Sequence, residues 1–273
     1  MAFRAKAVTE GGGKMKITVL GSCSGTEPMP GRHHTSVLLE AGEALYWFDA
    51  GESCAHTAHT SGFDLLRSRC LFITHPHMDH TGGLPHLVWT FAKLQWRDKR
   101  SMVYPFAIYT PYPPQVREYL SAGALTEFGP EMQKAAVHPV TDGVVYEDEN
   151  ISVEALHNRH LGDAPDGQWR SFSYRIQSRA DGKKVLLSGD VKSPSDLQPF
   201  LEDGSDLLLM ETGHHDPLEV CGFLNGLTMP PGKLLFYHHG RTILADPERC
   251  RTQCRQCYCN EVFLADDGMS ISL

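Results

Sequence analysis

The stretch that most constrains the fold of this 273-residue chain is Cys70–Gly83, CLFITHPHMDHTGG. Its apolar beginning predicts a buried strand. His75 and His77 are two residues apart, so they point to the same side of an extended backbone, and Asp79 and His80 follow on the loop. Four possible metal ligands within six residues exceed what one tetrahedral ion accepts once ligands from elsewhere are added, which favours a two-metal centre.

The hexapeptide HPHMDH, followed by Thr81-Gly82-Gly83, resembles the H-x-H-x-D-H signature of the metallo-β-lactamase superfamily. The resemblance implies an α/β fold of the αββα sandwich type, with two mixed β-sheets flanked by helices. A glycine-rich loop, a hairpin around Gly42 and a strand ending at Asp49 are similar, in this order, to the start of the ribonuclease Z and phosphodiesterase-like branch. In that branch the aspartate supports the metal site and is not itself a ligand.

Further ligands are expected at strand ends, because strands deliver side chains with small positional error. Asp190 closes an apolar strand, and its two carboxylate oxygens can bridge two cations. The segment resembles the G-D-T element of the superfamily, with Val191 in place of threonine. After the strand that begins at Ile151, the family spacing favours His160, with His157 as the alternative.

The last strand end with candidate ligands is that of Leu234–His239. The register of the family's L-T-H strand end favours His238 as the ligand, with His239 as the alternative. The predicted centre comprises one metal held by His75, His77 and His160, a second held by Asp79, His80 and His238, and Asp190 between them. Asp79 would also orient the nucleophile. His214 resembles the histidine that ribonuclease Z-like enzymes use to protonate the leaving group.

Other polar residues have weaker claims on the site. Glu211 and His215 are neighbours of His214 without an assigned role. His33 and His34 are expected to be solvent-exposed loop histidines, with a place at the mouth of the site as the alternative. His86 follows the metal loop on a predicted helix and is interpreted as a structural or surface residue.

Composition argues against some partners. The formal net charge of −8 argues against a surface that grips long nucleic acid through its phosphates, although bound cations could still attract a small anionic ester. No apolar run is long enough to span a bilayer, so no membrane partner is expected. Without a secretory signal the eight cysteines are expected to be reduced thiols in a cytoplasmic protein. The Cys250–Cys259 cluster lacks the paired C-x-x-C spacing of a structural zinc site and is interpreted as thiols.

The chain shows no linker or internal repeat. Residues 1–14, which contain Gly11-Gly12-Gly13, are predicted as a flexible N-terminal extension, and residues 15–273 as a single hydrolase domain. Glu261–Ala265 and Met269–Leu273 are predicted as the two strands of a closing hairpin.

The predicted function is that of a metal-dependent hydrolase with a dinuclear centre and a bridging hydroxide nucleophile, acting on a small phosphodiester. Two divalent ions are expected as cofactors, with zinc favoured and manganese or iron equally suited to these ligands. The alternatives are hydrolysis of a lactone, thioester or sulfate ester, and a di-iron redox or binding protein. His77 argues against the last, because flavin-linked oxidoreductases of the superfamily usually carry glutamate there.

Transfer RNA is not favoured as a partner. Only about thirty residues separate His160 from Asp190, which leaves no room for the long tRNA-gripping arm of ribonuclease Z. The interval holds instead the short segment Gly162–Arg170, which could cover a small substrate or be a plain surface loop. A homodimer is compatible with the sequence.

Overall fold

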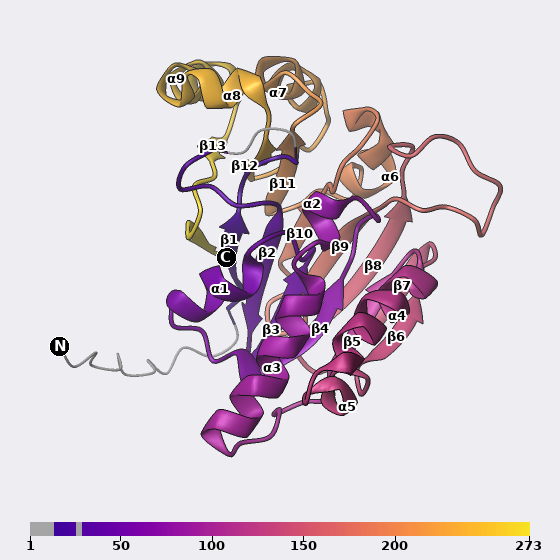
Figure 1. Cartoon of the computed structure of the whole chain (residues 1–273). Helices are drawn as coiled ribbons and strands as arrows, with labels where there is room; N and C mark the ends of the chain where they lie inside the picture. Colours follow the sequence, from indigo (N-terminus) through magenta and orange to yellow (C-terminus); the bar gives the residue numbers. More distant parts are fainter. Residues whose placement is uncertain (1–13, 26–28) are drawn as a thin grey trace.

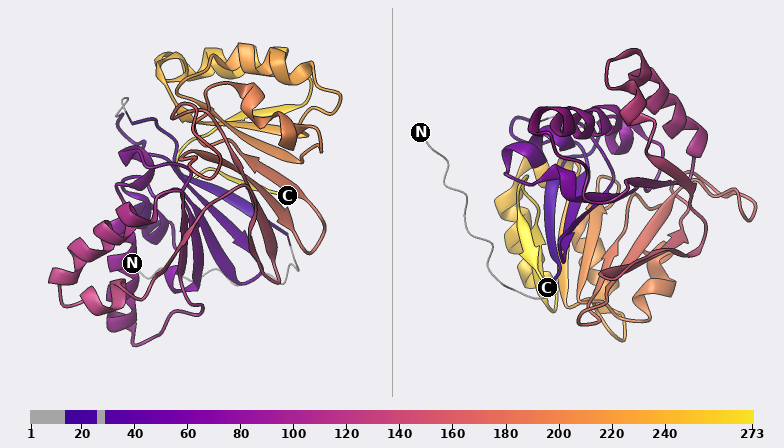
Figure 2. Two further views of the ribbon diagram at one scale, coloured as in Figure 1. Left: turned by 90° about the vertical axis from the view of Figure 1, so that its right-hand side faces the viewer. Right: turned by 90° about the horizontal axis from the view of Figure 1, so that it is seen from below.

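The computed structural model describes residues 14–25 and 29–273 of the chain. In this part the strands form two seven-stranded sheets that face each other, and helices cover the outer face of each sheet (Figures 1 and 2). The predicted fold class, an αββα sandwich with two mixed sheets, is therefore confirmed. The predicted N-terminal extension lies outside the described residues except for Lys14.

The first sheet joins antiparallel and parallel strands. In spatial order its strands are β14 (Ser270–Ser272), β1 (Lys16–Gly21), β2 (Ser36–Ala41), β3 (Ala44–Phe48), β4 (Ser68–Phe72), β5 (Ala107–Thr110) and β6 (Ala136–Pro139). Pairing is antiparallel from β14 to β3 and parallel from β3 to β6. The carboxyl ends of β3 and β4 therefore lie at the same edge.

The second sheet has the same arrangement. In spatial order its strands are β13 (Glu261–Leu264), β12 (Lys233–His239), β11 (Leu207–Thr212), β10 (Lys184–Leu187), β9 (Phe172–Ser178), β8 (Ile151–His157) and β7 (Gly143–Glu147). Pairing is antiparallel from β7 to β10 and parallel from β10 to β13. The parallel strands β10, β11 and β12 therefore bring their carboxyl ends together.

The main core lies between the sheets, where every second side chain of each strand points inward. Phe72 of β4 packs on Tyr174 of β9 with ring centroids 5.8 Å apart, and the Tyr174 hydroxyl donates a hydrogen bond to the Ile73 carbonyl across the sheets. Burial of these aromatic rings provides much of the apolar contact between the layers.

That residues 15–273 form a single domain stays a prediction.

Two further apolar layers lie under the helices. The helices that cover the first sheet are α1 (Cys54–Thr60), α3 (Leu84–Asp98), α4 (Pro113–Ala122) and α5 (Gly129–Met132). The helices that cover the second sheet are α6 (Gln198–Leu201), α7 (Pro217–Asn225), α8 (Arg241–Ala245) and α9 (Pro247–Cys257). Helix α3 buries Leu84, Leu87 and Phe91, whose helical spacing forms one apolar face. Within residues 14–25 and 29–273, no helix is long and apolar enough to cross a bilayer.

The predicted closing hairpin is wrong. Strand β13 pairs in parallel with β12 of the second sheet, whereas β14 pairs antiparallel with β1 of the first. The intervening turn crosses between the sheets because Asp267 accepts hydrogen bonds from the amide and hydroxyl of Ser22 and from the amide of His33. These bonds, with that from Gly268 N to Val19 O, hold the crossing turn against the first sheet.

The crossing turn gives a stability prediction. We expect Asp267→Ala to lower the free energy of unfolding by about 2 kcal/mol, because it leaves several partly buried donors without an acceptor. Asp266→Ala is the matched control: its carboxylate pairs with Arg32 but is 60% exposed, so we expect a loss below about 1 kcal/mol. Urea denaturation with a chelator present measures both variants, and equal losses would contradict the role of Asp267.

Candidate metal centre

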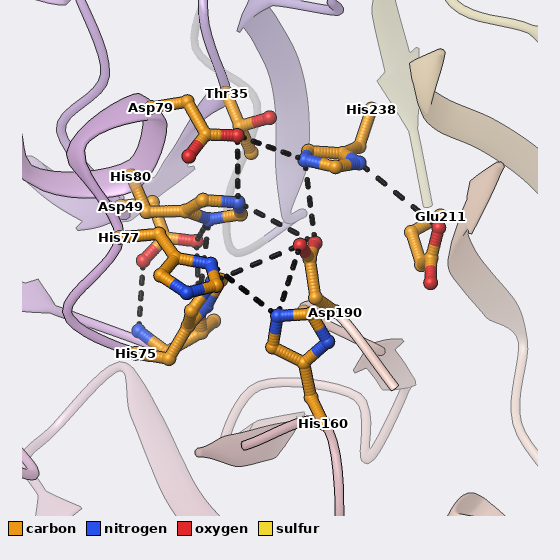
Figure 3. A network of polar contacts seen from close by, with 12 residues as sticks. Thr35, Asp49, His75, His77, Asp79, His80, His160, Asp190, Glu211 and His238 are labelled. Carbon is orange, nitrogen blue, oxygen red and sulfur yellow. Dashed lines mark hydrogen bonds and ion pairs between the residues drawn. The ribbon is translucent and has the colours of Figure 1, made fainter. Parts of the chain in front are cut away.

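The predicted ligands converge at one edge of the sandwich (Figure 3). The HPHMDH segment follows β4 and enters the short helix α2 (Met78–Thr81). His160 comes after β8, Asp190 comes after β10, and His238 lies near the end of β12. Three side chains from strand ends of the second sheet thus meet the four side chains of one loop of the first sheet.

The first group of potential ligands comprises His75, His77, His160 and Asp190. His77 Nδ1 lies 3.0 Å from His75 Nε2 and 3.4 Å from His160 Nε2. Both Nε2 atoms lie 3.7 Å from Asp190 Oδ2. Ligand atoms around a tetrahedral zinc ion are roughly 3.3 Å apart, given metal–nitrogen bonds of about 2.0 Å. These side chains are therefore spaced as one ion requires.

The second group comprises Asp79, His80 and His238. Asp79 Oδ2 lies 3.2 Å from His238 Nε2 and 3.6 Å from His80 Nε2. Both Nε2 atoms lie 3.4 Å from Asp190 Oδ1. One oxygen of Asp190 therefore faces the first group and the other faces the second, which is how a carboxylate bridges two cations.

Burial makes this arrangement costly without a cation. His80 Nε2 and Asp190 Oδ1 are buried and have no hydrogen-bond partner among the described residues. Burial alone would raise the pKa of Asp190, but the charges of His238 and His80 outweigh it and hold that pKa well below its usual range. Burial lowers the pKa of His75. The donor set fits divalent ions, whose binding would displace the protons that otherwise balance the charge.

Asp49 lies behind His80, not among the metal-facing atoms. Its carboxylate accepts hydrogen bonds from Thr74 N at 2.7 Å and Thr74 Oγ1 at 2.9 Å, and lies 2.7 Å from His80 Nδ1. Its φ of 59° places it in the left-handed region, which aspartate tolerates better than most residues. The buried carboxylate orients the His80 ring so that Nε2 faces the cluster.

His160 and His157 have separate environments. His157 Nδ1 lies 2.7 Å from Asp142 Oδ2, and its ring stacks on Trp169 with centroids 4.0 Å apart. Its side chain belongs to neither group of potential ligands. Asn158, which the sequence analysis missed, accepts the amide of His160 at 3.1 Å. An asparagine that bonds the backbone two residues on is a known turn signal, so it could have been recognised.

His238 and His239 are separated by a β-bulge. Glu211 pairs with Tyr237 and Thr212 with His239, so His238 is the extra residue and has φ of 49°. The bulge turns His238 toward Asp190. His239 instead lies 2.9 Å by its Nε2 from the Ala265 carbonyl, and burial lowers its pKa to about 3.

His214 lies at the mouth of the cluster with its side chain 45% exposed. Its Nδ1 is 3.1 Å from Glu211 Oε1 and 3.9 Å from Asp190 Oδ2. The hydrogen bond with Glu211 raises the pKa of His214. Glu211 is fully buried, and its Oε1 also lies 3.3 Å from His215 Nε2. Glu211 has no role in the site predicted from the sequence, although a carboxylate within an apolar strand is a signal of one.

Of the remaining candidates, His34 is half-buried and lines a recess beside Asp79, whereas the others lie elsewhere. His33 Nδ1 is 2.8 Å from Asp267, and His86 stacks on Trp89 with centroids 5.6 Å apart. Cys250 and Cys254 are buried residues of α9 itself, and Cys259 is exposed. Among the residues that the structure describes, the groups with metal-binding spacing contain histidine and aspartate and no cysteine.

Sequence comparison finds a matching family model and relatives described as ribonuclease Z. The family model of the Anti-Pycsar protein Apyc1 matches residues 15–229. Ribonuclease Z of Cyanothece sp. (strain PCC 7425 / ATCC 29141) is 37% identical over 270 residues, which cover 94% of this chain and 69% of the relative. Ribonuclease Z of Nostoc punctiforme is 32% identical over 215 residues, which cover 76% of this chain and 62% of the relative. The chain thus spans about two thirds of their lengths.

Solved structures share the fold. The metallo-β-lactamase fold protein YhfI from Bacillus subtilis superposes with a TM-score of 0.73 at 16% identity, covering 95% of this chain and 100% of that chain. The short form of human tRNase Z (ELAC1) gives 0.64 at 20% identity, covering 94% and 98%. Yeast PDE1 gives 0.69 at 15% identity, covering 96% and 100%. At such identities the likeness is one of fold.

Proposed function

The chain belongs to the family of the Anti-Pycsar protein Apyc1, within the metallo-β-lactamase superfamily of metal-dependent hydrolases, and from this premise we propose that it hydrolyses a small phosphodiester at a two-metal centre. The observation that carries the proposal is the position of Asp190, whose two oxygens face the two groups of ligands. We assign one ion to His75, His77 and His160 and the other to Asp79, His80 and His238.

The side chains divide the chemistry among them. When bound, two divalent ions would lower the pKa of a water between them and neutralise charge on the phosphoryl oxygens. Asp79 would orient the attacking oxygen through the carboxylate that lies beside His238. The hydrogen bond with Glu211 raises the pKa of His214, which favours its proton-donor role: His214 would give a proton on Nε2 to the departing oxygen while Nδ1 stays bonded to Glu211.

A small substrate fits this chain better than tRNA. Residues 158–171 alone connect β8 and β9 beside the cluster, so this connection has no long arm that could hold a large RNA. The formal net charge of −8 also opposes binding along an extended phosphate backbone.

We propose zinc as the first ion to test, with manganese and iron as alternatives that suit the same ligands.

A substrate panel tests the proposal. We expect the purified protein, supplied with Zn²⁺ or Mn²⁺, to hydrolyse bis-p-nitrophenyl phosphate and 3′,5′-cyclic nucleotides and to leave precursor tRNA, a lactone and an aryl sulfate intact. Product formation by chromatography measures each reaction. Efficient trimming of the tRNA, or turnover of the lactone or sulfate without that of any phosphodiester, would contradict the proposed substrate class.

A further inference from the structure

Two recesses lie beside different residues of the candidate site, one beside His214 and one beside Asp79. A recess of about 370 Å³ is lined by His214 together with Ser24. A second recess, of about 380 Å³, is lined by Asp79, His34 and Glu52. Ser24 and its neighbour Gly25 line different recesses, so this stretch of backbone separates the proposed proton donor from the second recess.

The recess beside Asp79 continues outward. A neighbouring hollow of about 340 Å³ shares His34 and Glu52 with it and extends to Arg32. The volumes of the two hollows are in the range of small-molecule sites, about 300–1,000 Å³. We call the two hollows together the Glu52 groove. It begins at a proposed metal ligand and has room for an organic group attached to the phosphorus.

The backbone holds the two polar residues of the Glu52 groove side by side. The amide of His34 donates to the carbonyl of Glu52 at 2.8 Å, and Gly51 N donates to Thr35 O at 3.0 Å. Across residues 14–25 and 29–273, neither the His34 nor the Glu52 side chain has a hydrogen-bond or ion-pair partner. Both residues line the groove, so their polar atoms are available to a ligand there.

Gly25 keeps the inner end of the Glu52 groove open. A Cβ atom at this position would lie 2.7 Å from Cγ and 2.8 Å from Oδ2 of Asp79. Any side chain would therefore displace the carboxylate that faces the second metal group. Because Gly25 has no side chain, the backbone can approach Asp79 this closely while the Asp79 carboxylate keeps its place beside His238.

From this geometry we infer that His34 and Glu52 bind the organic group of the substrate and select phosphodiesters whose sugar or base donates hydrogen bonds. The inference rests on the proposed function. An ionised carboxylate only accepts hydrogen bonds, so Glu52 needs a hydroxyl or amino group opposite it. Its negative charge also repels a further phosphate at this place. The groove therefore favours a single nucleotide unit over an oligonucleotide.

The test compares two substrates in one set of variants. For Glu52→Gln and His34→Ala we measure kcat/KM with purine and pyrimidine 3′,5′-cyclic nucleotides and with bis-p-nitrophenyl phosphate, which has no hydrogen-bond donors. We expect the ratio of nucleotide to aryl ester kcat/KM to fall about 10-fold, mainly through KM, with metal content unchanged. Glu43→Gln, an exposed carboxylate paired with Arg67, is the matched control and should keep the ratio.

A binding measurement separates this inference from the proposed function. Calorimetry with non-hydrolysable cyclic phosphorothioate nucleotides reports binding even if no phosphodiester is cleaved. Binding by the wild-type protein that weakens about 10-fold in Glu52→Gln supports the groove whatever the reaction. An unchanged substrate ratio, equal loss with both substrates, or no nucleotide binding by the wild-type protein would overturn it.

Discussion

Asp190→Asn is expected to lower the metal content from about two ions per chain to less than one and to reduce kcat for bis-p-nitrophenyl phosphate by about 10³-fold. One oxygen of Asp190 lies 3.7 Å from the Nε2 atoms of His75 and His160, and the other lies 3.4 Å from those of His80 and His238. Asparagine keeps the shape but replaces one oxygen with an NH₂ group, which repels a cation, and removes the negative charge.

His157→Ala is the control for the loss of metal expected in Asp190→Asn. His157 lies on the same strand end as His160, but it bonds Asp142 and stacks on Trp169 outside the cluster. We expect this variant to keep both ions and most of its activity, whereas His160→Ala should lose metal. Elemental analysis after gel filtration measures content directly. Two retained ions in Asp190→Asn, or equal metal loss in both histidine variants, would contradict the assignment.

The sequence indicates the loop residues of the candidate site more directly than its distant members. His75, His77, Asp79 and His80 lie within six residues, so local spacing alone indicates that they act together. The choice of His238 depended on resemblance, because a regular strand would alternate its two histidines. The bulge that turns His238 toward Asp190 arises from pairing with β11, and the pattern of the segment itself does not reveal such long-range pairing.

The closing strands were mispredicted for a related reason. Two short apolar segments around Asp266-Asp267-Gly268 have the local signals of a hairpin, yet each pairs with a different sheet. The sheet that each segment joins depends on the hydrogen bonds of Asp267 with Ser22 and His33, which lie more than 230 residues away in sequence. Turn propensity reports local conformation, whereas the partner of an edge strand depends on the assembled sheets.

The acidic character of the protein and the chemistry of its site are compatible. Bound cations would supply positive charge where the phosphate lies, and Glu52, which lines the recess beside Asp79, would present its negative charge to the organic group. A mononucleotide-sized diester meets both charges favourably. A polynucleotide would bring its next phosphate toward Glu52, so the same residue that selects the organic group opposes long chains.

Asp49→Asn is expected to weaken metal retention at the second group by 10- to 100-fold, although the residue touches no proposed ion. Asparagine tolerates the left-handed backbone at φ 59°, so the turn should persist. Its Oδ1 can still accept from Thr74 N, which places the NH₂ group where Asp49 Oδ2 now faces His80 Nδ1 at 2.7 Å. That NH₂ would force Nδ1 to accept, moving the ring proton to Nε2 and removing the lone pair that binds metal.

Asp49→Ala separates the tautomer effect from loss of the buried hydrogen bonds. Alanine leaves Thr74 N and His80 Nδ1 unpaired in a buried site and disfavours the positive φ, so it should lower the free energy of unfolding of the metal-free protein by about 3 kcal/mol. Asp49→Asn should lose about 1 kcal/mol, because most of its contacts persist. Chelator competition measures metal affinity, and long-range ¹H–¹⁵N NMR reads the His80 tautomer. If the Asp49→Asn variant kept wild-type metal affinity and its His80 ring kept the proton on Nδ1, the carboxylate of Asp49 would not be what orients His80. The contact between the end of β3 and the metal centre would then be purely structural.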